Sequence, residues 1–80
     1  MRTHTKRQRR NRPGVQHLWG FDNGHLASAV NDAQESHLWE LTVFDGNGRL
    51  ASSMPNRPEV MRALRPVDVR RVLRDIQTLP

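Results

Sequence analysis

Residues 38–48, with the sequence LWELTVFDGNG, decide the fold class of this chain. Trp39, Leu41 and Val43 stand at every second position, which is the period of a β-strand with one buried face. The Asp-Gly-Asn-Gly segment at 45–48 predicts a tight hairpin turn, because Asn and Gly tolerate positive φ. The stretch therefore predicts a strand that reverses at once into an antiparallel partner.

Two more strands are expected around this hairpin. Residues 25–30 follow a turn signal at 22–24 and alternate, with Leu26 and Val30 on one face and alanines on the other. Residues 49–54 return from the hairpin as the third strand. The local order predicts a strand, a second strand, a tight turn and a third strand.

The end of the chain predicts helix. Residues 59–64 fit roughly one and a half helical turns. Pro66 suits the first turn of a longer helix, because its missing N–H needs no partner there. That helix carries one apolar stripe, made of Val69, Val72, Leu73, Ile76 and Leu79. We therefore expect an α+β fold, a three-stranded antiparallel sheet with a C-terminal amphipathic helix on one face.

The positive charge of the chain is concentrated at one end. Residues 2–12 hold six cations and no acid, whereas the remainder carries seven Arg against eight acids. The formal net charge of +5 therefore belongs to the first residues and not to the globular part. Met1 is the one hydrophobic residue before residue 14, so we expect a disordered basic arm at 1–13 and one small α+β domain at 14–80.

The basic arm is the strongest candidate for a binding site. Its composition is similar to that of the arginine-rich peptides with which some phage antitermination proteins grip RNA hairpins. Guanidinium groups bind phosphates and guanine edges, and each phosphate contact releases counterions. The candidate nucleic-acid-binding residues are Arg2, Lys6, Arg7, Arg9, Arg10 and Arg12, extended along the helix by Arg70, Arg71 and Arg74. The alternatives are a solubilising tail, a translation start placed too far upstream, and a solvated helix face.

The aromatic residues suggest a second kind of surface. One helix covers one face of a sheet, so the opposite face, with Leu38 and Phe44, is expected to be open. Trp19 and Phe21 precede the recognisable strands and either seal this face or anchor a protein partner, since Trp is enriched at binding hot spots. A second copy is the third way to cover it, as a homodimer through the open sheet face.

Several classes of function are not expected. The absence of Cys excludes disulfides, a thiol nucleophile and Cys-ligated metals. His17, His25 and His37 stand 8 and 12 residues apart without the close pair of a zinc site, and residues 45–56 lack the carboxylates of a calcium loop. No nucleophile motif or phosphate-binding Gly loop occurs, so we expect no enzyme, no cofactor and no metal. No apolar segment suits a signal peptide or a membrane span, which predicts a cytoplasmic protein.

From about Gly24 onward the chain resembles a group of short, uncharacterised proteins of actinobacterial phages and prophages. The shared pieces are the strand at 38–44, the turn at 45–48, the Ser-Met-Pro at 53–55 and the helix that ends in Leu-Pro. The chain departs from the pattern at 57–59 and at Arg65, where a capping Ser or Thr is usual. The resemblance implies a ββα-type fold and a phage origin, and it implies no activity.

These observations favour a non-enzymatic phage accessory protein in the host cytoplasm that binds nucleic acid, with RNA favoured, through the basic arm. The alternative is a protein-binding modulator of a host or defence complex, which would act through the open sheet face or edge. A third reading is a small structural or assembly component whose arm neutralises packaged nucleic acid.

Overall fold

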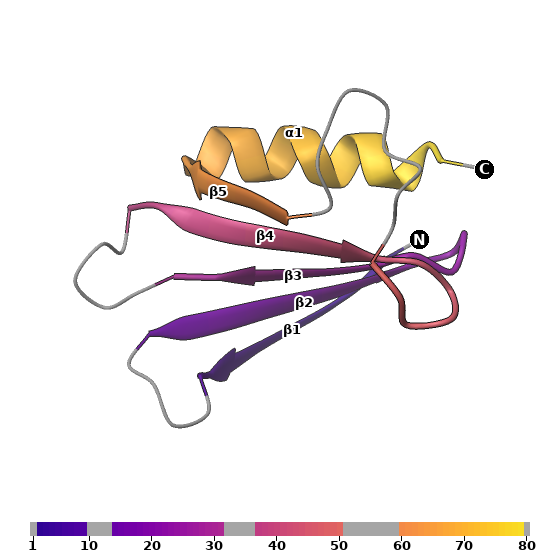
Figure 1. The fold of residues 1–80 in the computed structure, drawn as a ribbon, viewed down its shortest axis with the longest axis horizontal. Coiled ribbons are helices and arrows are strands. Elements are labelled where there is room, and N and C mark those ends of the chain that lie inside the picture. The colour runs from indigo at the N-terminus through magenta and orange to yellow at the C-terminus, as the bar shows by residue number, and fades with distance from the viewer. Residues whose placement is uncertain (1, 10–13, 32–36, 51–59, 80) are drawn as a thin grey trace.

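The computed structural model describes residues 2–9, 14–31, 37–50 and 60–79. These residues form five strands and one helix (Figure 1). In chain order the elements are β1 (Arg2–Gln8), β2 (Val15–Phe21), β3 (Leu26–Val30), β4 (Trp39–Phe44), β5 (Val60–Leu64) and α1 (Pro66–Gln77).

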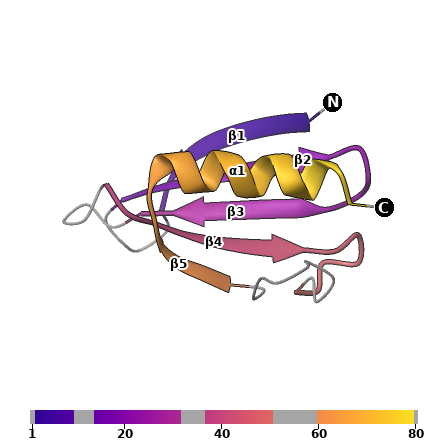
Figure 2. The same ribbon diagram turned by 90° about the horizontal axis from the view of Figure 1, so that it is seen from above.

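The strands form one antiparallel sheet in the order β1-β2-β3-β4-β5, so that each strand lies beside its neighbour in the chain. Helix α1 runs across one face of this sheet, and the other face has no helix in the described part of the chain (Figure 1). Seen from above, α1 lies over the middle of the sheet and β1 forms the edge beyond it (Figure 2). The molecule therefore has two layers, with a covered face and an open face.

The core lies between α1 and the covered face. Ala27 and Ala29 of β3 are 1% and 0% exposed, and their small side chains let the helix come close to the sheet. The period-two pattern of β4 is confirmed, since Leu41 and Val43 are fully buried. The apolar stripe of α1 is confirmed as well; its buried members are Val69, Val72, Leu73 and Ile76.

The expected three-stranded sheet is wrong, because the sheet has five strands. The expected disorder of the basic arm is wrong for residues 2–8, which form β1 and pair with β2 along its whole length. Disorder was predicted from composition, because the residues of β1 have little apolar surface to bury. Its pairing rests on the backbone ladder and on polar cross-strand contacts, such as Arg7 Nε donating to Gln16 Oε1 at 2.8 Å.

The prediction of a short helix at 59–64 is also wrong, since Val60–Leu64 form strand β5. Apolar residues at positions 60, 61 and 64 fit either structure, and the residue before Pro66 is biased away from helical geometry. The pairing of β4 with β5 is irregular between Trp39 and Leu41, and Ala63 opposite has a positive φ of 56°. The predicted strand at 49–54 begins with a bridge from Phe44 to Leu50, and residues 51–54 lie outside the described residues.

Helix α1 begins as predicted at Pro66, and its start is anchored without a capping hydroxyl. The Arg65 side chain accepts no hydrogen bond from the helix, because a guanidinium has donors only. The carboxylate of Asp68 instead accepts from the Arg65 N–H at 3.2 Å. This backbone hydrogen bond from Arg65 is the main reason that the pKa of Asp68 lies below its usual value.

Candidate nucleic-acid interface

The edge strand β1 is the most basic element of the sheet. Arg2, Lys6 and Arg7 stand on it, and neither β1 nor β2 contains an acidic residue. Residues 3–8 are all exposed, and β2 is the one strand that pairs with β1 within the described sheet. The edge therefore offers positive charge without a competing carboxylate beside it.

The cations of β1 reach both sides of the sheet. Lys6 pairs in register with His17, whose next neighbours across the sheet are the buried Ala29 and Leu41, so Lys6 belongs to the covered face. Arg7 pairs with Gln16 and belongs to the open face. A polyanion that follows the edge would meet a cation from either side.

Three flat rings cluster where β1 and β2 meet on the covered face. The Nε2 atom of His4 lies 2.6 Å from Nδ1 of His17, and the two imidazole planes differ by 10°. Because a hydrogen bond between ring nitrogens lies in the plane of the rings, the two imidazoles sit side by side rather than face to face. Both are nearly parallel to the indole of Trp19, at 8° and 15° and with centroids 5.0 and 5.6 Å away.

The pKa of His17 lies below its ordinary value. Burial is the main cause that lowers its pKa, and the nearby His4 and Lys6 lower it further. A neutral imidazole offers one donor and one acceptor nitrogen, which is what a hydrogen bond to a second imidazole requires. His17 also presents its edge to Trp39 of β4, with centroids 5.2 Å apart and planes at 69°.

A recess lies between this ring cluster and the first half of α1. We call it the aromatic groove, and its volume is about 210 Å³. Its lining is mainly apolar, and it consists of His17, Trp19, Trp39, Pro66, Val69, Arg70 and Leu73. Trp19 and Trp39 are half-buried, whereas Arg70 is exposed at the rim. Lys6, the cross-strand neighbour of His17, adds a second cation from the β1 side.

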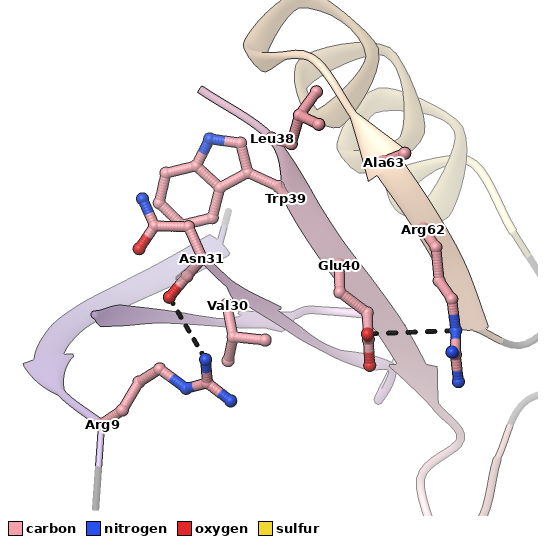
Figure 3. A pocket seen from close by; sticks show the side chains of 8 residues that line it. All are labelled: Arg9, Val30, Asn31, Leu38, Trp39, Glu40, Arg62 and Ala63. Carbon is pink, nitrogen blue, oxygen red and sulfur yellow. Dashed lines mark hydrogen bonds and ion pairs between the residues drawn. The ribbon is translucent and has the colours of Figure 1, made fainter. Parts of the chain in front are cut away.

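A second recess of about 360 Å³ lies at the end of the sheet where β1 and β3 finish and β4 begins (Figure 3). Arg9 reaches into it and donates from Nη1 to the backbone oxygen of Asn31 at 3.3 Å. Across the recess Arg62 faces Glu40 at 3.9 Å, with the Arg62 side chain largely exposed and the Glu40 side chain 45% exposed. Since an exposed ion pair this long is weak, both partners remain largely solvated.

The structure gathers some of the predicted nucleic-acid residues and separates others. Arg2, Lys6 and Arg7 share strand β1, Arg9 follows it, and Arg10 and Arg12 lie outside the described residues. On α1, Arg70 borders the aromatic groove, whereas Arg71 lines another recess beside β5 with Met61 and Leu64. Arg74 is exposed one helical turn after Arg70.

The predicted partner-binding residues do not form one surface. Phe21 is 7% exposed and belongs to the core under α1, and Trp19 lines the aromatic groove on the same covered face, so neither seals the open face. Phe44 does lie on the open face, next to Leu18 and Leu26. Leu38 lines the recess of Figure 3 instead.

His4 was not predicted to be a site residue. A signal was available, because Thr3 and Thr5 alternate with His4 and Lys6 in the manner of a strand. Among the residues that the structure describes, no group of three metal-ligating side chains is found. In the same residues no helix is long and apolar enough to cross a membrane.

No family model, curated protein or solved structure matches this chain. The geometry of the site therefore carries the functional argument.

Proposed function

We propose that this protein is a non-enzymatic nucleic-acid-binding protein, with RNA as the favoured ligand, and that β1 is its principal contact with the phosphate backbone. The observation that carries the proposal is the acid-free edge strand, which presents Lys6 and Arg7 to opposite sides of the sheet. Phosphate contacts of this kind supply most of the affinity in nonspecific nucleic-acid binding, through the release of counterions.

The same charges make β1 a poor edge for pairing with another copy of itself. Exposed cations on an edge strand are a common way in which proteins discourage association between sheet edges. Two β1 strands side by side would bring six cations together, three from each chain. A polyanion removes that repulsion, which favours nucleic acid over a second copy at this edge.

The test is a fluorescence-anisotropy titration of an RNA strand at several salt concentrations. Lys6→Ala combined with Arg7→Ala should lower the affinity and reduce the slope of log K against log salt by about 1.4, since each contact on a single strand contributes about 0.7. Arg49→Ala combined with Arg62→Ala, which removes two exposed cations away from β1, is the matched control. Equal losses in both variants, or no binding at low salt, would refute the proposal.

The open face favours a second candidate, self-association. Leu26, Phe44 and Leu50 follow one another across that face in register, and Leu26 and Leu50 are 48% and 50% exposed. A second copy placed face to face would bury this row. Sedimentation equilibrium should then show a dimer that Leu26→Asp dissociates; a monomer at all concentrations would exclude this candidate.

A further inference from the structure

We propose that the aromatic groove accepts an unpaired nucleobase, so that the preferred ligand is single-stranded rather than duplex nucleic acid. This inference rests on the proposed function and adds to it a site for the base. Its starting point is that both tryptophans of the chain line one recess, with a cation on either side of it.

The lining of the groove suits a flat, aromatic ligand. Trp19, Trp39 and His17 provide ring surfaces, and Val69 and Leu73 of α1 close the opposite wall. Stacking on aromatic side chains is the usual way in which proteins hold unpaired bases without regard to sequence. The groove volume of about 210 Å³ is below the roughly 300–1,000 Å³ of pockets for drug-sized ligands, which fits a single heterocycle.

The charges around the groove suit the backbone of a nucleotide. Lys6 approaches from β1 as the cross-strand neighbour of His17, and Arg70 approaches from α1. Arg70 is the one charged residue in the lining of the groove. A base held against the indoles would therefore leave its phosphates near a cation on each side.

The position of the groove discriminates between single strands and duplexes. It lies between α1 and β2, with β1 as the edge beyond, so the rings are half-buried rather than raised above the surface. A base in a duplex is stacked and paired, and it would have to leave the helix before it could enter such a recess. An unpaired base can enter the groove without the free-energy cost of unstacking and unpairing.

The intrinsic tryptophan fluorescence of the protein reports on ligands in the groove. The chain contains two Trp and no Tyr, and both tryptophans line the groove. A base that stacks there should quench nearly all of the intrinsic fluorescence, whereas phosphates that bind only to β1 should leave it almost unchanged.

The experiment compares three RNA ligands of equal length, about eight nucleotides, within the range that small single-strand-binding domains cover. They are oligouridylate, the same strand with abasic sugars, and a duplex. Oligouridylate should quench the fluorescence and bind about tenfold more tightly than the abasic strand, while the duplex should bind without quenching. Affinity is measured separately by anisotropy of an end label.

Three results would overturn the inference, and they differ in what they mean for the proposed function. Equal affinity for oligouridylate and the abasic strand without quenching would refute the base site but leave backbone binding by β1 intact. No binding of any ligand at low salt would refute both. Tight binding of an apolar peptide with quenching, together with equal binding of the two strands, would assign the groove to a protein ligand.

Variants provide an independent check. Trp19→Leu keeps an apolar side chain but removes the ring, and it should lower affinity for oligouridylate about fivefold or more while leaving the abasic strand within about twofold. Arg62→Gln is the control, at an exposed position on β5, the opposite edge of the sheet from β1. If Trp19→Leu fails to fold, the comparison of ligands with the unaltered protein still decides the question.

Discussion

The imidazole of His4 and the imidazole of His17 are joined by a hydrogen bond of 2.6 Å between the edge strand and its neighbour. Such a bond needs a donor on one ring and an acceptor on the other, so the pair can keep it with at most one positive charge. Protonation of both rings would therefore remove one of the cross-strand contacts that hold β1 to β2.

Acidification should weaken the attachment of β1. The pKa of His17 in the folded protein lies below its ordinary value of 6.5, chiefly because of burial. The unfolded chain therefore binds more protons than the folded protein just below pH 6.5, and stability falls as the pH drops through this window toward the lowered pKa. Hydrogen exchange of the β1 amides between about pH 5 and 8 would measure this loss of stability.

His17→Gln provides the control for this pH dependence. Glutamine retains a donor and an acceptor but does not titrate, so the additional loss of β1 protection below pH 6.5 should disappear. An unchanged pH profile in the variant would show that another group causes the effect.

Gly20→Ala should weaken the attachment of β1 through a contact on the open face of the sheet. A Cβ atom at position 20 would lie 2.9 Å from Oγ1 of Thr3, closer than carbon and oxygen normally approach. Because the Thr3 side chain is exposed and can turn away, we expect only a small loss, at most about 1 kcal/mol, in the free energy of unfolding. Urea denaturation followed by circular dichroism would measure it.

The control for Gly20→Ala is the double variant that also carries Thr3→Ala. Without Oγ1 the new methyl group has room, and the reduced freedom of the unfolded chain should then make Gly20→Ala neutral or stabilising by up to about 1 kcal/mol. Additive losses in the double variant would mean that the contact with Thr3 is not the cause.

Asn23 should stabilise the end of α1 from the turn between β2 and β3. Its side-chain amide donates to the backbone oxygens of Ile76 at 2.7 Å and Leu79 at 3.0 Å. Asn23→Ala should cost about 1–3 kcal/mol, because each of these carbonyls at the helix end loses one hydrogen bond, although the Ile76 oxygen keeps the one from the Leu79 N–H. Asn23→Asp should cost at least as much, since a carboxylate would face the two oxygens and the negative end of the helix. Thermal unfolding of both variants tests this order.

Ile76→Ala should be the most damaging of the helix substitutions. Ile76 is 0% exposed and belongs to the core, so its truncation should cost about 2–5 kcal/mol. Gln77→Ala, at the exposed neighbouring position, should change stability by less than about 0.5 kcal/mol. Similar losses at both positions would contradict the placement of α1 on the sheet.

The elements that could be predicted are those in which one face is apolar. The alternation in β4 and the stripe of α1 both specify a buried side, and both were predicted within a residue or two. Strand β1 could not be found in this way, because Thr3–Gln8 bury little and are ordered by β2. Strand β5 was assigned to a helix because five residues fit either period.

Of the residues in the candidate site, the charged ones were predicted as a site and the shared aromatic groove was not. Lys6 and Arg7 were named from the composition of the arm, but their presentation on a sheet edge depends on pairing with β2. Trp19 and Trp39 stand 20 positions apart in the chain and belong to different strands. That they share one groove with Arg70 follows from where α1 crosses the sheet, which no local pattern specifies.

Because the strands lie in the sheet in the same order as in the chain, the sheet can form while the protein is being synthesised. Each strand can pair with its predecessor as soon as it emerges, since β1 to β5 are neighbours in the order of synthesis. The cover of the core, α1, is made after all of them. Until residues 66–77 are released, the nascent sheet exposes Leu41, Val43 and the alanines of β3 to solvent, and a chaperone can bind this apolar face during that interval.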